Sequence, residues 1–65
     1  MKFIKLKEVM VMTGLARATV YKHIANNKFP KSVSLGERAV AWIESEVEEW
    51  MLERIAERDE AIIIG

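Results

Sequence analysis

The spacing of apolar side chains predicts two short amphipathic helices in the first part of the chain. The first covers residues 6–13, and its inward face comprises Leu6, Val9, Met10 and Thr13. Gly14 follows and supplies the permissive backbone that a tight turn requires. The second covers about residues 16–26, and its buried stripe comprises Leu15, Val20 and Ile24. Asn27 is expected to end this helix in the left-handed conformation.

Alternation of apolar and polar residues then predicts a two-stranded hairpin over residues 31–42. Its apolar positions are Val33, Leu35, Val40 and Trp42, which alternate with serines and alanines. Pro30 forces an extended entry, and Gly36-Glu37-Arg38 closes the turn. Because an isolated two-stranded ribbon is barely stable, we expect its apolar face to pack on the helices.

A third helix is predicted over about residues 46–57. Ser45 and Glu48 have the spacing of a capping box, which satisfies free backbone amides at a helix start. The inner face comprises Val47, Trp50, Met51, Arg54 and Ile55, and both tryptophans of the chain are expected to anchor the core. Residues 58–65 form an expected tail, whose Ile62–Ile64 stretch either frays or docks on a partner.

These elements predict one domain, residues 1–65, that is mainly α with a small β-hairpin, an α+β winged helix–turn–helix in the order α-α-β-β-α. A chain of 65 residues buries only about 60% of the surface that its unfolded form exposes. The absence of cysteine excludes disulfides and thiolate metal sites and fits a reducing cytosol. No apolar run approaches the roughly 20 residues of a membrane helix, so a soluble cytoplasmic protein is expected.

The formal net charge of zero hides two opposed halves. Residues 1–40 hold eight lysines and arginines against two glutamates, a net charge of +6. Residues 41–65 hold two arginines against seven glutamates and one aspartate, a net charge of −6. A short charge run usually just solvates an exposed face, but segregation along the whole chain indicates a charged partner for the basic half.

The outward face of the second helix carries groups that suit double-stranded DNA. A rotation of about 100° per residue places Arg17, Tyr21 and Lys22 away from the buried stripe, with Thr19 on its flank. Arginine can make paired hydrogen bonds to guanine or phosphate, and hydroxyl groups can fix register on phosphates. The expected contacts beyond this helix are Lys28, Lys31 and Arg38, with Lys31 and Arg38 on either side of the hairpin. The alternative gives the cations ordinary solvated roles and Tyr21 a place at the core edge.

An enzyme is not expected, because a catalytic site needs convergent groups. The chain has one histidine, one aspartate and no glycine-rich phosphate loop. His23 lacks a nearby carboxylate in the sequence, so packing or contact with a DNA backbone explains it better than catalysis or metal binding. No cofactor, metal or small-molecule ligand is expected, and the glutamates of the third helix are interpreted as a solvated face.

Several motifs occur together over about residues 3–55. They are Glu8-Val9, Thr13-Gly14-Leu15, Arg17, Thr19, Val20-Tyr21, Phe29-Pro30-Lys31, Leu35-Gly36, Arg38-Ala39-Val40-Ala41-Trp42 and Val47-Glu48-Glu49-Trp50. This set resembles the AlpA family of prophage regulatory proteins, small relatives of the MerR and excisionase winged helices. The resemblance implies a DNA-binding transcriptional regulator of the kind that often acts on integrase or excision genes of mobile elements. The chain departs from the family at Ala16 and Ala18, where serine is usual, at Asn27, where glycine is common, and at Val11 and Met12.

The expected function is therefore sequence-specific regulation of a prophage or mobile element, with residues 16–26 in the major groove and residues 31–42 on the flanking backbone. A homo-oligomer or a cooperative array on DNA is expected, because one such module specifies only a few base pairs. One alternative is an architectural excision factor that binds and bends attachment-site DNA. Another is a protein-interaction module, such as an antirepressor, that uses the outward-facing Val11 and Met12 together with Ile62–Ile64.

Overall fold

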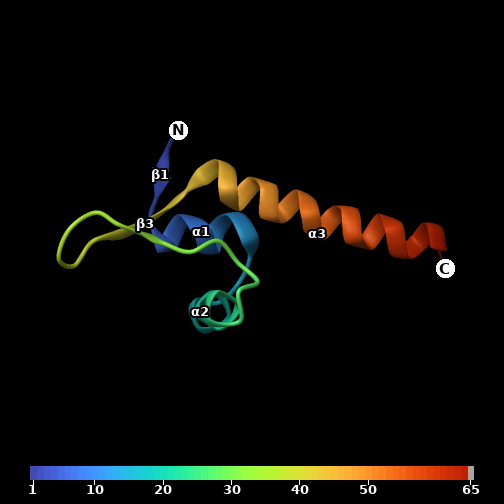
Figure 1. The fold of residues 1–65 in the computed structure, drawn as a ribbon, viewed down its shortest axis with the longest axis horizontal. Coiled ribbons are helices and arrows are strands. Elements are labelled where there is room, and N and C mark those ends of the chain that lie inside the picture. The colour runs from blue at the N-terminus through green and yellow to red at the C-terminus, as the bar shows by residue number, and fades with distance from the viewer. Residues whose placement is uncertain (65) are drawn as a thin grey trace.

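Three helices and a three-stranded antiparallel sheet make up the protein, as a computed structural model shows (Figure 1). The structure describes the backbone of residues 1–64 and the side chains of residues 1–60. The elements are β1 (Phe3–Ile4), α1 (Leu6–Thr13), α2 (Arg17–Ala25), β2 (Val33–Ser34), β3 (Val40–Ile43) and α3 (Glu44–Ile64). The predicted α+β class and the succession of two helices, a hairpin and a third helix are confirmed.

Strand β3 lies at the centre of the sheet, between β1 and β2. On the β1 side, Phe3 pairs with Ile43 and Ile4 pairs with Trp42. On the β2 side, Val33 pairs with Ala41 and Ser34 pairs with Val40. Strand β1 has only two residues and is not predicted by the apolar pattern of the sequence. A strand this short has too few residues to show an alternating pattern. It forms because β3, which is distant in the sequence, supplies its hydrogen-bond partners.

The turns on either side of α2 have the predicted backbone conformations. Gly14 ends α1 with a φ of +73°, and its N–H donates to the Met10 carbonyl oxygen at 2.8 Å. A φ in this region suits glycine because it lacks a Cβ atom. Asn27 has a φ of +58° after the end of α2, a conformation that asparagine tolerates better than most residues.

The hydrophobic core takes one side chain from almost every segment. Its buried residues are Ile4, Val9, Val20, Phe29, Trp42 and Val47. Trp42 is fully buried, and its indole Nε1–H donates to the Pro30 carbonyl oxygen at 3.0 Å. Trp50 is half-buried, and its Nε1–H donates to the Lys28 carbonyl oxygen at 2.6 Å. Both tryptophans therefore anchor the core, as predicted, and both also hold the segment that follows α2.

Two predicted burial patterns are wrong in part. Leu35 and Val40 are 46% and 41% exposed, because the distal part of the hairpin projects past the helices that cover Trp42 (Figure 1). Met12, which was expected to face outward, is half-buried and packs against the core. Val11 does face outward, with 71% of its surface exposed.

The predicted start of the third helix is also wrong. Helix α3 begins at Glu44, directly after β3, so Ser45 lies inside the helix and does not cap it. The Glu44 N–H instead donates to the Lys2 carbonyl oxygen at 2.8 Å, which extends the pairing of β1 with β3 to the first residue of the helix. Helix α3 continues to Ile64, well past the predicted end at residue 57.

The core does not extend along the whole of α3. Figure 1 shows its C-terminal part projecting beyond the other elements, and Ile55, predicted to face inward, is 46% exposed. The side chains of Ile62–Ile64, for which fraying or docking was predicted, lie outside the described residues.

Replacement of Trp42 tests how far the fold depends on its indole ring. Trp42→Phe removes part of a fully buried ring and its hydrogen bond to the Pro30 carbonyl, so we expect the free energy of unfolding to fall by about 2 kcal/mol. Chemical denaturation followed by circular dichroism measures this loss. Leu35→Ala on the exposed hairpin serves as the control and should change stability by less than about 0.5 kcal/mol. Equal losses of unfolding free energy in both variants would contradict the conclusion that the fold depends on Trp42.

Helix α2 begins without a side-chain cap, which provides a second test. Ala16 occupies the N-cap position with extended backbone (φ −74°, ψ 157°) and makes no capping hydrogen bond. Ala16→Ser introduces a hydroxyl that can accept from a free amide of the first turn, so stability should rise by about 1 kcal/mol. Ala18→Ser, at the second residue of the helix, adds the same hydroxyl without capping geometry and should not stabilise the protein. No difference between the two variants in thermal unfolding would show that the helix start is satisfied in another way.

Candidate nucleic-acid interface

Helix α2 carries four side chains for which DNA contact is expected, Arg17, Thr19, Tyr21 and Lys22. The helix buries Val20 and half-buries Ile24, as the predicted stripe requires. Arg17 and Lys22 are exposed, and Thr19 is half-buried at the edge of the helix face. The cations therefore lie in solvent while the helix is fixed to the core from its other side.

Tyr21 joins this face to the core. Its ring meets the ring of Trp42 edge-on, with centroids 6.4 Å apart and planes at 61°. The Arg17 guanidinium lies 6.0 Å from the centroid of the same tyrosine ring, at the outer limit of a cation–π contact. Tyr21 remains 41% exposed, so the structure gives it the core-edge position that was the alternative and leaves part of it accessible.

The segment between α2 and β2 is held at three successive residues. Lys28 and Pro30 accept the two indole hydrogen bonds through their carbonyl oxygens, and Phe29 between them is buried. The Phe29 ring meets the Trp50 ring edge-on, with centroids 4.8 Å apart. Because these contacts fix the backbone, the exposed side chains of Lys28 and Lys31 start from a defined position next to the end of α2.

The hairpin separates its two candidate cations. Pairing of Val33 with Ala41 places Lys31 at the base of the hairpin, near the sheet, and Arg38 in the turn at its tip. Both side chains are exposed, and they lie at opposite ends of the hairpin. The turn is closed by the Leu35 N–H, which donates to the Ala39 carbonyl oxygen at 2.7 Å.

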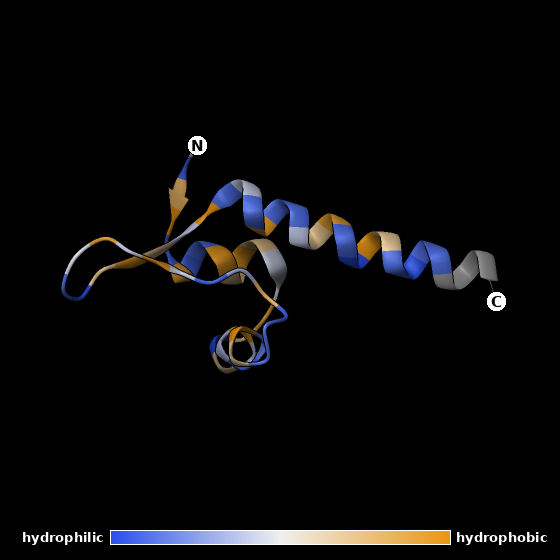
Figure 2. Ribbon diagram, in the orientation of Figure 1, coloured by the Kyte–Doolittle hydropathy of each residue, from blue (hydrophilic) through white to orange (hydrophobic). Residues whose placement is uncertain are grey.

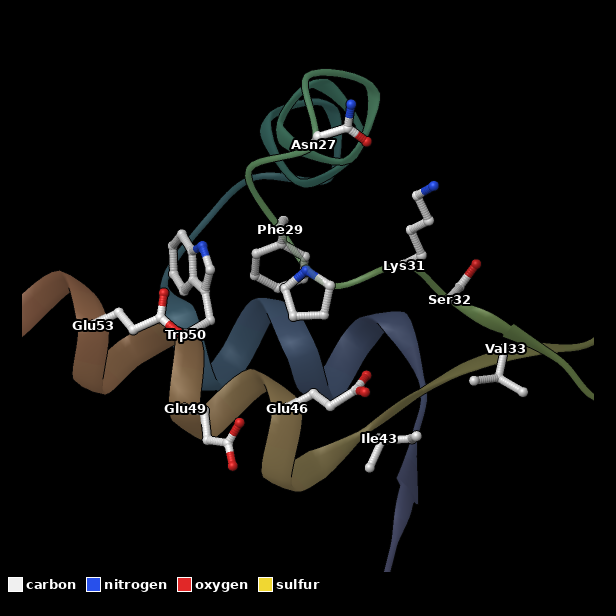
Figure 3. Close-up of a pocket in the computed structure, with 11 residues that line it drawn as sticks. Asn27, Phe29, Lys31, Ser32, Val33, Ile43, Glu46, Glu49, Trp50 and Glu53 are labelled. Carbon is white, nitrogen blue, oxygen red and sulfur yellow. The ribbon is translucent and has the colours of Figure 1, made fainter.

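The acidic side chains are concentrated on another element. A groove of about 670 Å³ separates the Asn27–Val33 segment from α3. Figure 3 shows Lys31 extending toward the side of Asn27, whereas Glu46, Glu49 and Glu53 project from α3. Among the described side chains, the ion pairs join Lys2 to Glu44, Arg54 to Glu53 and Glu57, and Arg58 to Asp59. No cation of α2, the following segment or the hairpin takes part in them.

His23 packs against Trp50, with ring centroids 6.3 Å apart and a tilt of 41°. This contact agrees with the packing role that was one of two interpretations of the histidine. Within residues 1–60, no group of three or more histidine, aspartate or glutamate side chains converges in a way that could hold a metal ion. Within the same part of the chain, no helix combines the length and the apolar character needed to cross a membrane.

The two indole hydrogen bonds and the contact between Tyr21 and Trp42 are not predicted by the sequence pattern. Both are long-range contacts: Trp50 and Lys28, for example, are 22 residues apart. The available signal was the presence of two tryptophans together with a Phe-Pro segment, because a buried indole N–H needs a carbonyl partner and a segment that proline keeps out of helices has carbonyl groups to offer.

Comparison with known proteins gives the same family as the motifs of the sequence. Residues 2–55 match the model of a family described as prophage CP4-57 regulatory protein (AlpA). The chain is 49% identical to uncharacterized protein ORF88 of Enterobacteria phage P4, over 88% of this chain and 65% of that protein, so it spans about two thirds of this relative's length. It is 37% identical to the DNA-binding transcriptional activator AlpA of Escherichia coli (strain K12), over 82% of this chain and 84% of that protein. A family match over most of the chain, on a fold with the predicted helix pair and hairpin, shows that this chain belongs to the AlpA family of prophage regulatory proteins.

Proposed function

We propose that this protein binds double-stranded DNA and acts as a sequence-specific transcriptional regulator of a prophage or another mobile element. One observation carries the proposal: the exposed cations of α2, of the following segment and of the hairpin have no acidic partner among the described residues, whereas the acids gather on α3. Cationic side chains that form no ion pair within the protein can neutralise the phosphates of DNA. The name of the Escherichia coli relative, a DNA-binding transcriptional activator, supports the same class of activity.

In this proposal α2 enters the major groove, which admits one α-helix. Arg17, at the first helical residue, makes paired hydrogen bonds to guanine or to phosphate, and Lys22 neutralises a phosphate. Thr19 and Tyr21 donate their hydroxyl hydrogens to phosphate oxygens and thereby fix the register of the helix on the duplex. The contact of Tyr21 with Trp42 supports this role, because a residue that fixes register must itself be held in place.

The remaining cations are assigned to the flanking backbone. Lys28 and Lys31 lie next to the end of α2, and Arg38 lies at the tip of the hairpin. Their separation along the hairpin suits contacts with phosphates at different distances from the major-groove site rather than with a single phosphate. The acidic surface of α3 would face away from the duplex, since phosphates repel carboxylates.

Sequence specificity requires more than one copy of the protein in this proposal. A single module of 65 residues contacts only a few base pairs, and useful discrimination against a genome needs a longer site. Two or more copies bound side by side would supply that length, either as a dimer on a two-fold site or as an array.

Fluorescence anisotropy of labelled duplexes tests the proposal directly. The two duplexes are the region upstream of the protein's own gene and a scrambled sequence of the same composition, each measured over a series of salt concentrations. We expect preference for the native duplex and affinity that falls as salt rises, because bound cations displace counterions from phosphates. Lys22→Ala and Arg38→Ala should each weaken binding about 10-fold and lower the slope of log affinity against log salt by about 1.

Lys2→Ala is the matched control for this experiment. It removes the same charge from an exposed lysine beside β1, outside α2 and the hairpin, whose ammonium lies 3.7 Å from Glu44. The affinity of this variant for DNA should stay within about twofold of the wild type, because Lys2 contacts no phosphate in the proposal. The proposal would be overturned if folded protein bound neither duplex at low salt, or if the control weakened binding as much as the two test variants.

A further inference from the structure

An apolar groove lies on α1 and borders the proposed DNA-binding face, with which it shares Arg17. It has a volume of about 520 Å³ and is lined by Leu6, Lys7, Met10, Val11, Leu15 and Arg17. Val11 is 71% exposed at its wall, and Lys7 and Arg17 place two cations at its rim. Small-molecule sites combine apolar walls with several converging polar groups, whereas this groove has apolar walls and charges at the rim only. Its chemistry suits the apolar face of an amphipathic segment that carries acids.

The C-terminal part of α3 presents such a segment. Leu52 and Ile55, one turn apart on one helix face, are 63% and 46% exposed. Glu48 and Asp59 extend the same stripe by one turn at either end, so it has two aliphatic side chains between two acids. This stripe lies on a different side of α3 from Val47 and Met51, which pack into the core. Figure 2 shows hydrophobic residues continuing along α3 where it extends past the other elements.

We propose that copies of this protein associate head to tail, with the Leu52–Ile55 stripe of one copy seated in the α1 groove of the next. Charge selects a second copy as the occupant. The chain is divided into a half of charge +6 that contains the groove and a half of charge −6 that contains the stripe. Pairing two α3 helices brings acids together, and pairing two α1 grooves brings Lys7 and Arg17 near their own copies. Only the groove-to-stripe contact joins opposite charges.

A contact between two different surfaces has a structural consequence. Each copy retains one free groove and one free stripe, so the association continues into a ring or an open chain and does not stop at a two-fold dimer. The contact is small, so it is weak between free molecules. It becomes effective when neighbouring copies are held close together, because the local concentration is then high. The association needs no DNA, and it can therefore be tested apart from the proposed function.

Sedimentation of two variants and of their mixture tests the contact without DNA. Val11→Asp places a charge in the groove, and Leu52→Asp places a charge on the stripe; both sites are exposed, so the fold should be retained, as circular dichroism will verify. For the wild type at about 1 mM, the weight-average mass should rise to about twice the 7.5 kDa of the monomer. Each variant alone should remain a monomer under the same conditions.

The mixture of the two variants gives the decisive result. Val11→Asp keeps an intact stripe and Leu52→Asp keeps an intact groove, so the equimolar mixture should form a complex of one copy of each and grow no further. A wild type that stays monomeric at 1 mM, or a mixture that stays monomeric, would overturn the inference. Association of Val11→Asp alone would also overturn it, since that result means that α3 pairs with α3. Arg17 is unchanged in both variants, so DNA binding by each monomer remains a separate question.

Discussion

The structure depends on two indole N–H groups that reach back to one segment of the chain. Trp42 on the central strand and Trp50 on α3 donate to the carbonyl oxygens of Pro30 and Lys28, on either side of the buried Phe29. This segment connects α2 to the hairpin, so the two hydrogen bonds set the position of one relative to the other. Without these donors the two carbonyls would depend on water for their partners, and the segment would be held by the buried Phe29 ring and by the Lys28 N–H, which donates to the His23 carbonyl oxygen.

The same arrangement explains how a chain with no net charge can present a basic surface. The cations assigned to DNA are carried on α2, on the segment that follows it and on the hairpin, whereas most of the acids are carried on α3, whose C-terminal part projects beyond the other elements (Figure 1). Segregated charge of this kind steers binding to oppositely charged partners, while a total near zero limits long-range attraction. In the proposed function the basic side faces DNA, and in the proposed association the acidic side faces the next copy.

The sequence was informative wherever the structure is local. Helix periodicity located α1 and α2 to within one residue or so, Gly14 and Asn27 marked the turns through their backbone preferences, and the outward cations of α2 followed from its phase. The errors occurred where a distant segment decides the outcome. β1 exists because β3 pairs with it, and α3 starts at Glu44 because the strand ends there, so the capping pattern at Ser45 had no helix end to cap.

Trp50→Phe tests the central claim most directly, because it keeps an aromatic ring beside Phe29 and removes the N–H that holds the Lys28 carbonyl, together with part of the half-buried indole ring. The measurement is the ratio of affinities for the duplex from upstream of the gene and for a scrambled duplex, on protein shown to be folded. If the hydrogen bond fixes α2 relative to the hairpin, the ratio should fall about tenfold, or roughly 1.4 kcal/mol, while the salt dependence stays the same because no charge is lost. An unchanged ratio would contradict the claim that this segment sets the geometry of the interface.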